Sequence, residues 1–257
     1  MPVWSQVVAS PSAVLLAALF SGHVLADFLA QTSTLAARKR RSAPAMLLHG
    51  FLVLAVHLAC VLPFWSVELL AGVLAIALSH LAVDVFRARV DPRWKQPLAS
   101  LLMDQGLHAA AILACWAWLA SRGAAERGWI EFDPAWMPAA SRMLLLASGF
   151  VFNAKGGTGI VRSLLARFPQ AVPAARTADE DVYATGRVVG CLERFIVLGL
   201  VLLDQWAAIG LVLAAKSIAR FKELDSRPFA DYYLIGTLTS VGVALASGFL
   251  LRAVLFQ

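Results

Sequence analysis

The feature that most constrains this chain is a series of apolar runs, each long enough to cross a lipid bilayer. The first is the stretch PSAVLLAALFSGHVLADFLA, residues 11–30. A membrane-spanning helix needs about 20 mostly apolar residues. The chain is 60% hydrophobic and 15% charged, whereas soluble domains are about half apolar and about a quarter charged. The sequence therefore predicts an all-α fold, a polytopic membrane helix bundle.

Basic or proline-containing loops separate these runs and predict about seven or eight transmembrane helices. The expected spans are residues 11–33, 44–65, 67–87, 97–120, 139–164, 186–203, 206–221 and 231–254. They suggest two four-helix membrane domains, residues 1–122 and residues 139–257.

Lysine and arginine residues indicate the orientation of the spans. The net charge is +6, and the basic residues gather in four loops that alternating threading places on one side. Basic loops of membrane proteins remain in the cytoplasm, so both termini are expected on the opposite, periplasmic side. The positive charge therefore indicates topology, and no nucleic-acid partner is predicted.

Histidine and aspartate recur as pairs within the first four spans, four residues apart in each case. The pairs are His23 with Asp27, His80 with Asp84, and Asp104 with His108, and a single His49 begins the second span. Residues four apart share one face of a helix. Alternating threading places all of them at a similar depth near the cytoplasm. Four helices would then each supply one face to a single site.

Imidazole and carboxylate groups together suit zinc, manganese or iron(II). The predicted metal ligands are His23, Asp27, His49, His80, Asp84, Asp104 and His108. They are enough for two ions, or for one ion with further carboxylates that orient its histidines. We expect a divalent metal, zinc first, with manganese or iron as alternatives. The competing interpretation is a hydrogen-bonded His–Asp network that holds the helices together.

The order of these residues also carries a resemblance. The patterns are H-x-L-x-D-F-x-x-Q at residues 23–31, L-x-H at 47–49, H-x-x-x-D at 80–84 and D-Q-x-x-H at 104–108. They resemble a bacterial inner-membrane family, number 3307 among the domains of unknown function, over about residues 12–120. The back half resembles a four-span extension that some members carry. The resemblance implies a multi-pass protein of the bacterial inner membrane, similar in style to membrane-bound metal-dependent hydrolases.

A second group of polar residues falls near the cytoplasmic level of the back half. The predicted substrate-binding residues are Arg187, Glu193, Arg194, Lys216, Arg220 and Tyr233. Arginine and lysine bind anions through charge-assisted hydrogen bonds, which favours a phosphate-bearing substrate. The alternative is a set of snorkelling side chains that anchor the helices at the cytoplasmic surface. The nearby stretch NAKGGTGIVRS lacks the G-K-[ST] of a phosphate loop and indicates a kink or close helix packing.

The function predicted from these patterns is that of a membrane-embedded, metal-dependent hydrolase with a cytoplasm-facing site. A bound metal would activate water and polarise a phosphoryl or acyl oxygen, and Asp84 or Asp104 would act as the catalytic base. The expected partners are membrane lipid and a phosphate-bearing molecule, either a lipid phosphate or a nucleotide-linked lipid. The alternatives are a divalent-metal transporter, which needs ligands along a path across the membrane, and a scaffold or sensor with a structural metal.

The topology can be tested by cysteine accessibility. In a variant carrying Arg40→Cys, a membrane-impermeant thiol reagent should modify the new cysteine only from the cytoplasmic side, because residue 40 lies in a strongly basic loop. Modification of intact cells from outside would contradict the topology, and the shared depth of the histidines with it.

Overall fold

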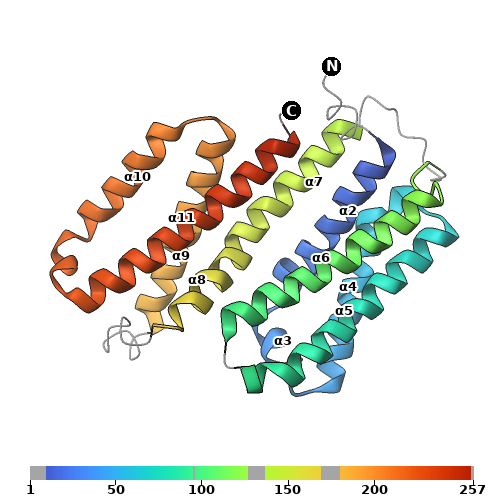
Figure 1. The fold of residues 1–257 in the computed structure, drawn as a ribbon, viewed down its shortest axis with the longest axis horizontal. Helices are drawn as coiled ribbons and strands as arrows, with labels where there is room; N and C mark the ends of the chain where they lie inside the picture. Colours follow the sequence, from blue (N-terminus) through green and yellow to red (C-terminus); the bar gives the residue numbers. More distant parts are fainter. Residues whose placement is uncertain (1–9, 95, 127–136, 169–179, 256–257) are drawn as a thin grey trace. The chain divides into compact units, whose positions relative to one another are not determined.

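The computed structural model describes residues 10–94, 96–126, 137–168 and 180–255, and these residues form helices joined by turns (Figure 1). No strand occurs within those ranges. Among the described residues, six helices are long and apolar enough to cross a membrane: Pro11–Ala30, Ala43–Phe64, Val67–Val90, Pro97–Ser121, Ala139–Leu165 and Arg227–Leu255. The predicted all-α fold of membrane-length helices is thereby confirmed.

The sixth and seventh predicted spans, residues 186–203 and 206–221, are not among these six. Helix α10 (Trp206–Ala219) has only 14 residues. At 1.5 Å per residue it is about 21 Å long, which is shorter than the roughly 30 Å hydrocarbon core of a bilayer. Helix α9 (Glu180–Leu202) is longer but carries several charged side chains.

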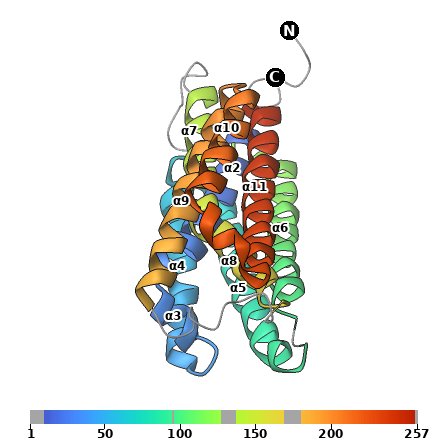
Figure 2. The same cartoon turned by 90° about the vertical axis from the view of Figure 1, so that its left-hand side faces the viewer.

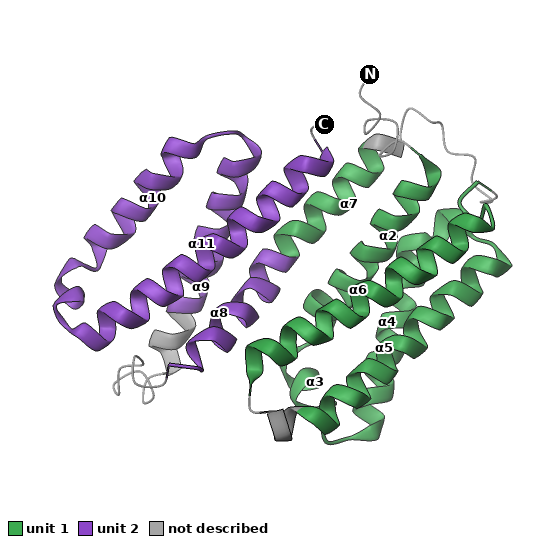
Figure 3. Ribbon diagram, in the orientation of Figure 1, with its two compact units in different colours: residues 1–151, 257 green, residues 152–256 purple. Residues whose placement is uncertain are grey.

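The chain forms two compact units (Figure 3), residues 1–151 with residue 257, and residues 152–256. We call them unit 1 and unit 2. The boundary falls inside the fifth span, where α7 (Met137–Val151) leads through a π-helical segment, Phe152–Gly156, into α8 (Gly157–Leu165). The first half of this span therefore packs within unit 1, although the sequence suggested that the whole span begins the second domain.

Unit 1 is a helical bundle built around α2 (Figures 1 and 2). Its long helices are α2 (Pro11–Val24, continued by the π-helical segment Leu25–Ala30), α4 (Ala43–Val61), α5 (Val67–Trp94), α6 (Pro97–Ser121) and α7. Helix α2 contacts α4, α6 and α7, while α5 contacts α4 and α6. Helices α2, α4, α5 and α6 thus form a closed ring, and the short α3 (Ser33–Arg38) packs against α4.

The interior of unit 1 is apolar where α2 and α5 begin and where α4 and α6 end. Leu15, Leu19, Val73 and Leu119 are fully buried there. The outward faces are also apolar, as Phe51 on α4 illustrates with 64% of its surface exposed. Apolar residues therefore occupy both the core and the outer faces, as expected of helices that face lipid, and buried charged groups stand out as exceptions.

Unit 2 is organised around α9, which contacts α8, α10 and α11 (Arg227–Leu255). The buried core includes Val197 and Val201 of α9, Ile209 of α10 and Ala244 of α11. Gly248 lets α11 approach α9 closely, because a Cβ atom at this position would lie 2.7 Å from Cγ1 of Val201.

Replacement of Gly248 should destabilise unit 2. In Gly248→Ala the new methyl group overpacks the contact with Val201, and we expect a loss of about 1–3 kcal/mol in the free energy of unfolding. Gly242→Ala on the same helix is the matched control, since its Cβ meets nothing within 4 Å. Thermal unfolding in detergent measures both, and equal midpoints would contradict the close packing.

Candidate functional site

The histidines and aspartates predicted to bind metal lie together inside unit 1. They come from α2 and its π-helical extension (His23, Asp27), α4 (His49), α5 (His80, Asp84) and α6 (Asp104, His108), and none is more than 9% exposed. Successive helices run in opposite directions, so the ends of α2 and α5 meet the beginnings of α4 and α6. The structure therefore brings together residues that lie up to 85 positions apart (23 to 108).

At the centre of this cluster, three ligand atoms form a compact triangle. Nε2 of His49 lies 3.0 Å from Nε2 of His80. Oδ1 of Asp27 lies 3.3 Å from the first of these atoms and 3.2 Å from the second. Zinc with ligand bonds of about 2.0–2.1 Å in a tetrahedron keeps neighbouring ligand atoms about 3.3 Å apart. The spacing of the three atoms therefore suits one small cation.

A second ligand group shares Asp27 and adds His23 and His108. Nδ1 of His23 lies 3.9 Å from Oδ2 of Asp27, on the other side of the carboxylate. Nε2 of His23 donates to the side-chain oxygen of Gln105 at 3.3 Å, and Nδ1 has no hydrogen-bond partner among the described residues. Neither ring nitrogen of His108 has a hydrogen-bond partner among the described residues. Buried nitrogens of this kind are available as metal ligands.

Asp84 and Asp104 differ from Asp27 because each has a basic partner. Nζ of Lys39 donates to both carboxylate oxygens of Asp84 at 2.8 Å. Nη1 of Arg87 donates to Oδ2 of Asp104 at 2.6 Å. The sequence assigned Lys39 and Arg87 only to basic loops and missed this contact. Arg87 follows Asp84 by three residues on the same helix, so the sequence could have placed both side chains on one face. Nothing in the sequence points to Lys39.

Gln105 donates hydrogen bonds to two of the three buried carboxylates, those of Asp27 and Asp104. Its amide nitrogen donates to Oδ2 of Asp104 at 3.1 Å and to Oδ2 of Asp27 at 3.4 Å. The sequence patterns included Gln105, but the predicted ligand set did not. His57, interpreted from the sequence as a core histidine, lies outside both ligand groups and donates from Nδ1 to the carbonyl of Val53 at 2.8 Å.

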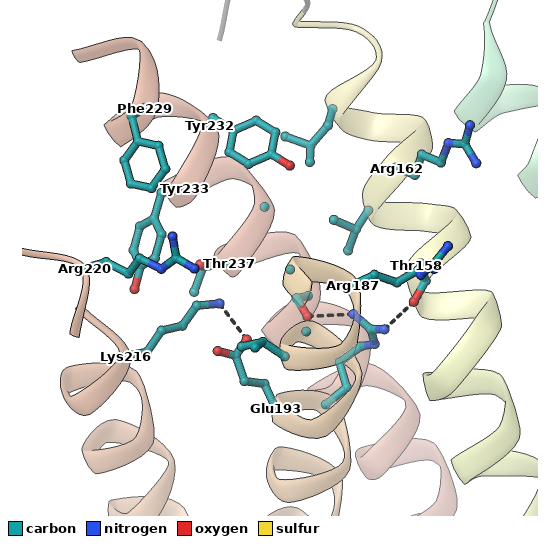
Figure 4. A pocket seen from close by; sticks show the side chains of 18 of the residues that line it. Thr158, Arg162, Arg187, Glu193, Lys216, Arg220, Phe229, Tyr232, Tyr233 and Thr237 are labelled. Carbon is teal, nitrogen blue, oxygen red and sulfur yellow. Dashed lines mark hydrogen bonds and ion pairs between the residues drawn. The ribbon is translucent and has the colours of Figure 1, made fainter. Parts of the chain in front are cut away.

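The predicted substrate-binding residues lie together in unit 2, around a cavity of about 850 Å³ (Figure 4). Its lining includes Arg187, Glu193, Arg194, Lys216, Arg220 and Tyr233, and also residues outside the predicted substrate-binding set, such as Thr158, Arg162 and Ser240. Nζ of Lys216 lies 2.6 Å from Oε2 of Glu193 and 5.4 Å from the centre of the Tyr233 ring. The second cluster therefore lines a cavity with basic side chains.

Loss of Arg87 should destabilise unit 1. In Arg87→Met, Asp104 becomes a buried carboxylate without its cation, and removal of one partner of a buried pair costs about 3–5 kcal/mol. Arg89→Met, an exposed change on the same helix, is the control. Combining Arg87→Met with Asp104→Leu should recover stability in a denaturation assay. If Arg87→Met by itself is as stable as wild type, the Arg87–Asp104 pair is not buried in the membrane.

Comparison with known proteins shows a similarity for the front of the chain. Residues 15–132 match the family described as "Protein of unknown function (DUF3307)". All residues of the unit 1 cluster fall within the matched segment. No curated protein and no solved structure matches the chain. The order of histidines and aspartates agrees with this match, so residues 15–132 are similar to the DUF3307 family.

Proposed function

We propose that the unit 1 cluster binds one or two divalent cations, with zinc the first candidate and manganese or iron the alternatives. The observation that carries this proposal is the environment of Asp27. Lys39 pairs with Asp84 and Arg87 pairs with Asp104, but Asp27 contacts only histidines and the Gln105 amide among the described residues. A buried carboxylate without a compensating charge costs several kcal/mol. A bound cation supplies that charge.

The ligand geometry supports the same proposal. The two ligand groups share Asp27, whose Oδ1 faces His49 and His80 while its Oδ2 lies on the side of His23. A carboxylate shared in this way is suited to bridge two cations about 3.5–4 Å apart. Two imidazoles with one carboxylate suit zinc, and also suit manganese or iron(II).

The proposed reaction is hydrolysis of a phosphate-bearing substrate at this site. A bound cation activates water and polarises a phosphoryl oxygen. Asp84 lies next to the ligand triangle, with Oδ2 3.3 Å from Nε2 of His49, so it is placed to accept a proton. Lys39 and Arg87 carry N–H donors at the same cluster, and these donors suit phosphoryl oxygens as well as carboxylates. Asp104 with Arg87 is the second candidate for the basic role.

The single cluster favours a hydrolase over a transporter. Within the part of the chain that is described, every group of three or more ligands close enough to hold an ion belongs to this cluster. A transport path needs further ligands at other depths. We place the protein in the bacterial inner membrane with this cluster toward the cytoplasm and both termini in the periplasm, on the basis of the basic loops.

Metal content of the purified protein tests the cation site. We expect about one or two equivalents of zinc, manganese or iron in the wild type, as the ligand sets for one or two ions require, and loss of the metal in His80→Ala. His57→Asn is the matched control, because His57 is equally buried but outside the ligand groups, and asparagine keeps a donor for the Val53 carbonyl. A folded wild type that stays metal-free after metal is added back would overturn the proposal.

Turnover of phosphate esters by the metal-loaded protein tests the reaction. Asp84→Asn should keep the metal, because Asp84 is outside both ligand groups, and should lower the rate by about 10²–10⁴-fold, as expected for loss of a general base. A variant that unfolds instead would support the scaffold alternative, in which the metal or the His–Asp network is structural. Full activity of the variant would remove Asp84 from the mechanism.

A further inference from the structure

The cavity in unit 2 combines apolar walls with basic side chains. Helices α8, α9, α10 and α11 line it, and its apolar wall includes Val161, Leu165, Val189 and Phe229. Its volume of about 850 Å³ falls within the roughly 300–1,000 Å³ of small-molecule sites. Figure 4 shows Lys216 and Arg220 on one side, Glu193 between the helices, and Phe229 and Tyr233 of α11 nearby.

The charges that line this cavity do not cancel. Glu193, the acidic residue of the lining, is paired with Lys216. Arg220 pairs with Glu223 at 2.7 Å. Arg187 and Arg194 make no ion pair with any described residue, and Arg194 is only 3% exposed. The cavity therefore carries an excess of positive charge, part of it buried among apolar helices, and this charge is complementary to an anion.

Arg194 is fixed in place by neutral groups. Its Nε donates to the carbonyl of Asn153 at 2.6 Å, and Nη2 donates to the carbonyl of Ala154 at 3.4 Å, both in the π-helical segment Phe152–Gly156. Nη1 and Nη2 also donate to the hydroxyls of Ser240 and Thr158, at 3.1 Å and 2.6 Å.

These contacts occupy four of the five N–H groups that a guanidinium carries. The remaining N–H, on Nη1, has no acceptor among the described residues. Gly157 leaves room for the side chain, because a Cβ atom there would lie 2.8 Å from Nε of Arg194. A rigid arginine with one free donor and no counter-charge, at the lining of a cavity, is built to receive an anionic group.

We propose that this cavity binds a lipid with a phosphate headgroup. The phosphate lies at Arg187 and the free N–H of Arg194, and the hydrocarbon chain lies along Val161, Leu165 and Val189. The apolar wall distinguishes such a lipid from free phosphate, which has nothing to bury there. As a choice of substrate class this rests on the proposed function, but the binding site is argued from unit 2 alone and is measured without turnover.

Binding to the full-length protein in detergent tests the proposal with three probes: oleoyl lysophosphatidic acid, monoolein, which has the same chain without phosphate, and inorganic phosphate. We expect the lysophosphatidic acid to bind with one equivalent and at least about tenfold more tightly than the other two, because monoolein lacks the phosphate and inorganic phosphate lacks the chain. Equal binding of monoolein would overturn the proposed role of the arginine side chains in binding phosphate. Equal binding of inorganic phosphate would overturn the choice of a lipid as the ligand.

Matched variants locate the site. Gly190→Leu places a side chain in the cavity, whereas Gly199→Leu on the same helix meets open space outside it. Arg187→Ala removes a cavity cation, whereas Lys222→Ala removes an exposed one elsewhere in unit 2. We expect the two cavity variants to weaken lysophosphatidic acid binding about tenfold or more and the controls to match wild type. Wild-type binding by both cavity variants would overturn the site.

The metal variant separates this inference from the proposed function. His80→Ala should lose metal yet bind lysophosphatidic acid as wild type does, because the cavity is lined entirely by residues of unit 2. Loss of lipid binding in a folded His80→Ala protein would contradict a binding site that unit 2 forms by itself. If the protein binds lysophosphatidic acid but never holds metal, the hydrolase proposal is wrong and the lipid-binding proposal stands.

Discussion

The cost of holding a charge among apolar helices governs the front half of this protein. Three aspartates lie buried in unit 1, in a chain whose helices are otherwise apolar on nearly every face. Two of them meet a lysine or an arginine at hydrogen-bonding distance. Asp27 does not, and the side chains closest to its carboxylate are the histidines His49 and His80. Buried ion pairs add little to stability compared with apolar packing, so such a cluster indicates function.

Unit 2 also holds a buried charge, and there the charge is positive. Arg194 is a buried cation that contacts only carbonyl and hydroxyl oxygens, so its hydrogen bonds are largely satisfied while its charge is not. This arrangement is possible because the π-helical segment offers backbone carbonyls to a side chain from a neighbouring helix. In both units most of these polar groups lie on packed helices, whereas Lys39 and Arg220 lie in turns. Sites of that kind are held more rigidly than sites on loops.

Much of this arrangement could be predicted from the sequence. The helical period places His80 and Asp84 on one face, and alternation of span direction brings both to the level of His49 and Asp104. The roles of Lys39 and Arg87 could not be predicted, because a basic residue at a membrane edge has the same sequence signature whether it faces water or reaches inward. The predicted span 206–221 also extended beyond its helix. Helix α10 ends at Ala219, Arg220 caps it, and Phe221 begins a short 3₁₀ helix.

The sequence indicated a kink or close packing at NAKGGTGIVRS, but neither π-helical segment could be identified, because one additional residue in a turn changes no periodicity that can be read by eye. Their consequence is clearest in the span from Ala139 to Leu165. One residue of an α-helix corresponds to a rotation of about 100°, so an inserted residue resets the angular phase of everything that follows it. Helix α7 can therefore present one face to α2 while α8 presents an independently chosen face to α11. The span thus contributes α7 to unit 1 and α8 to unit 2, and the π-helical segment lets each helix present the face that its own bundle requires.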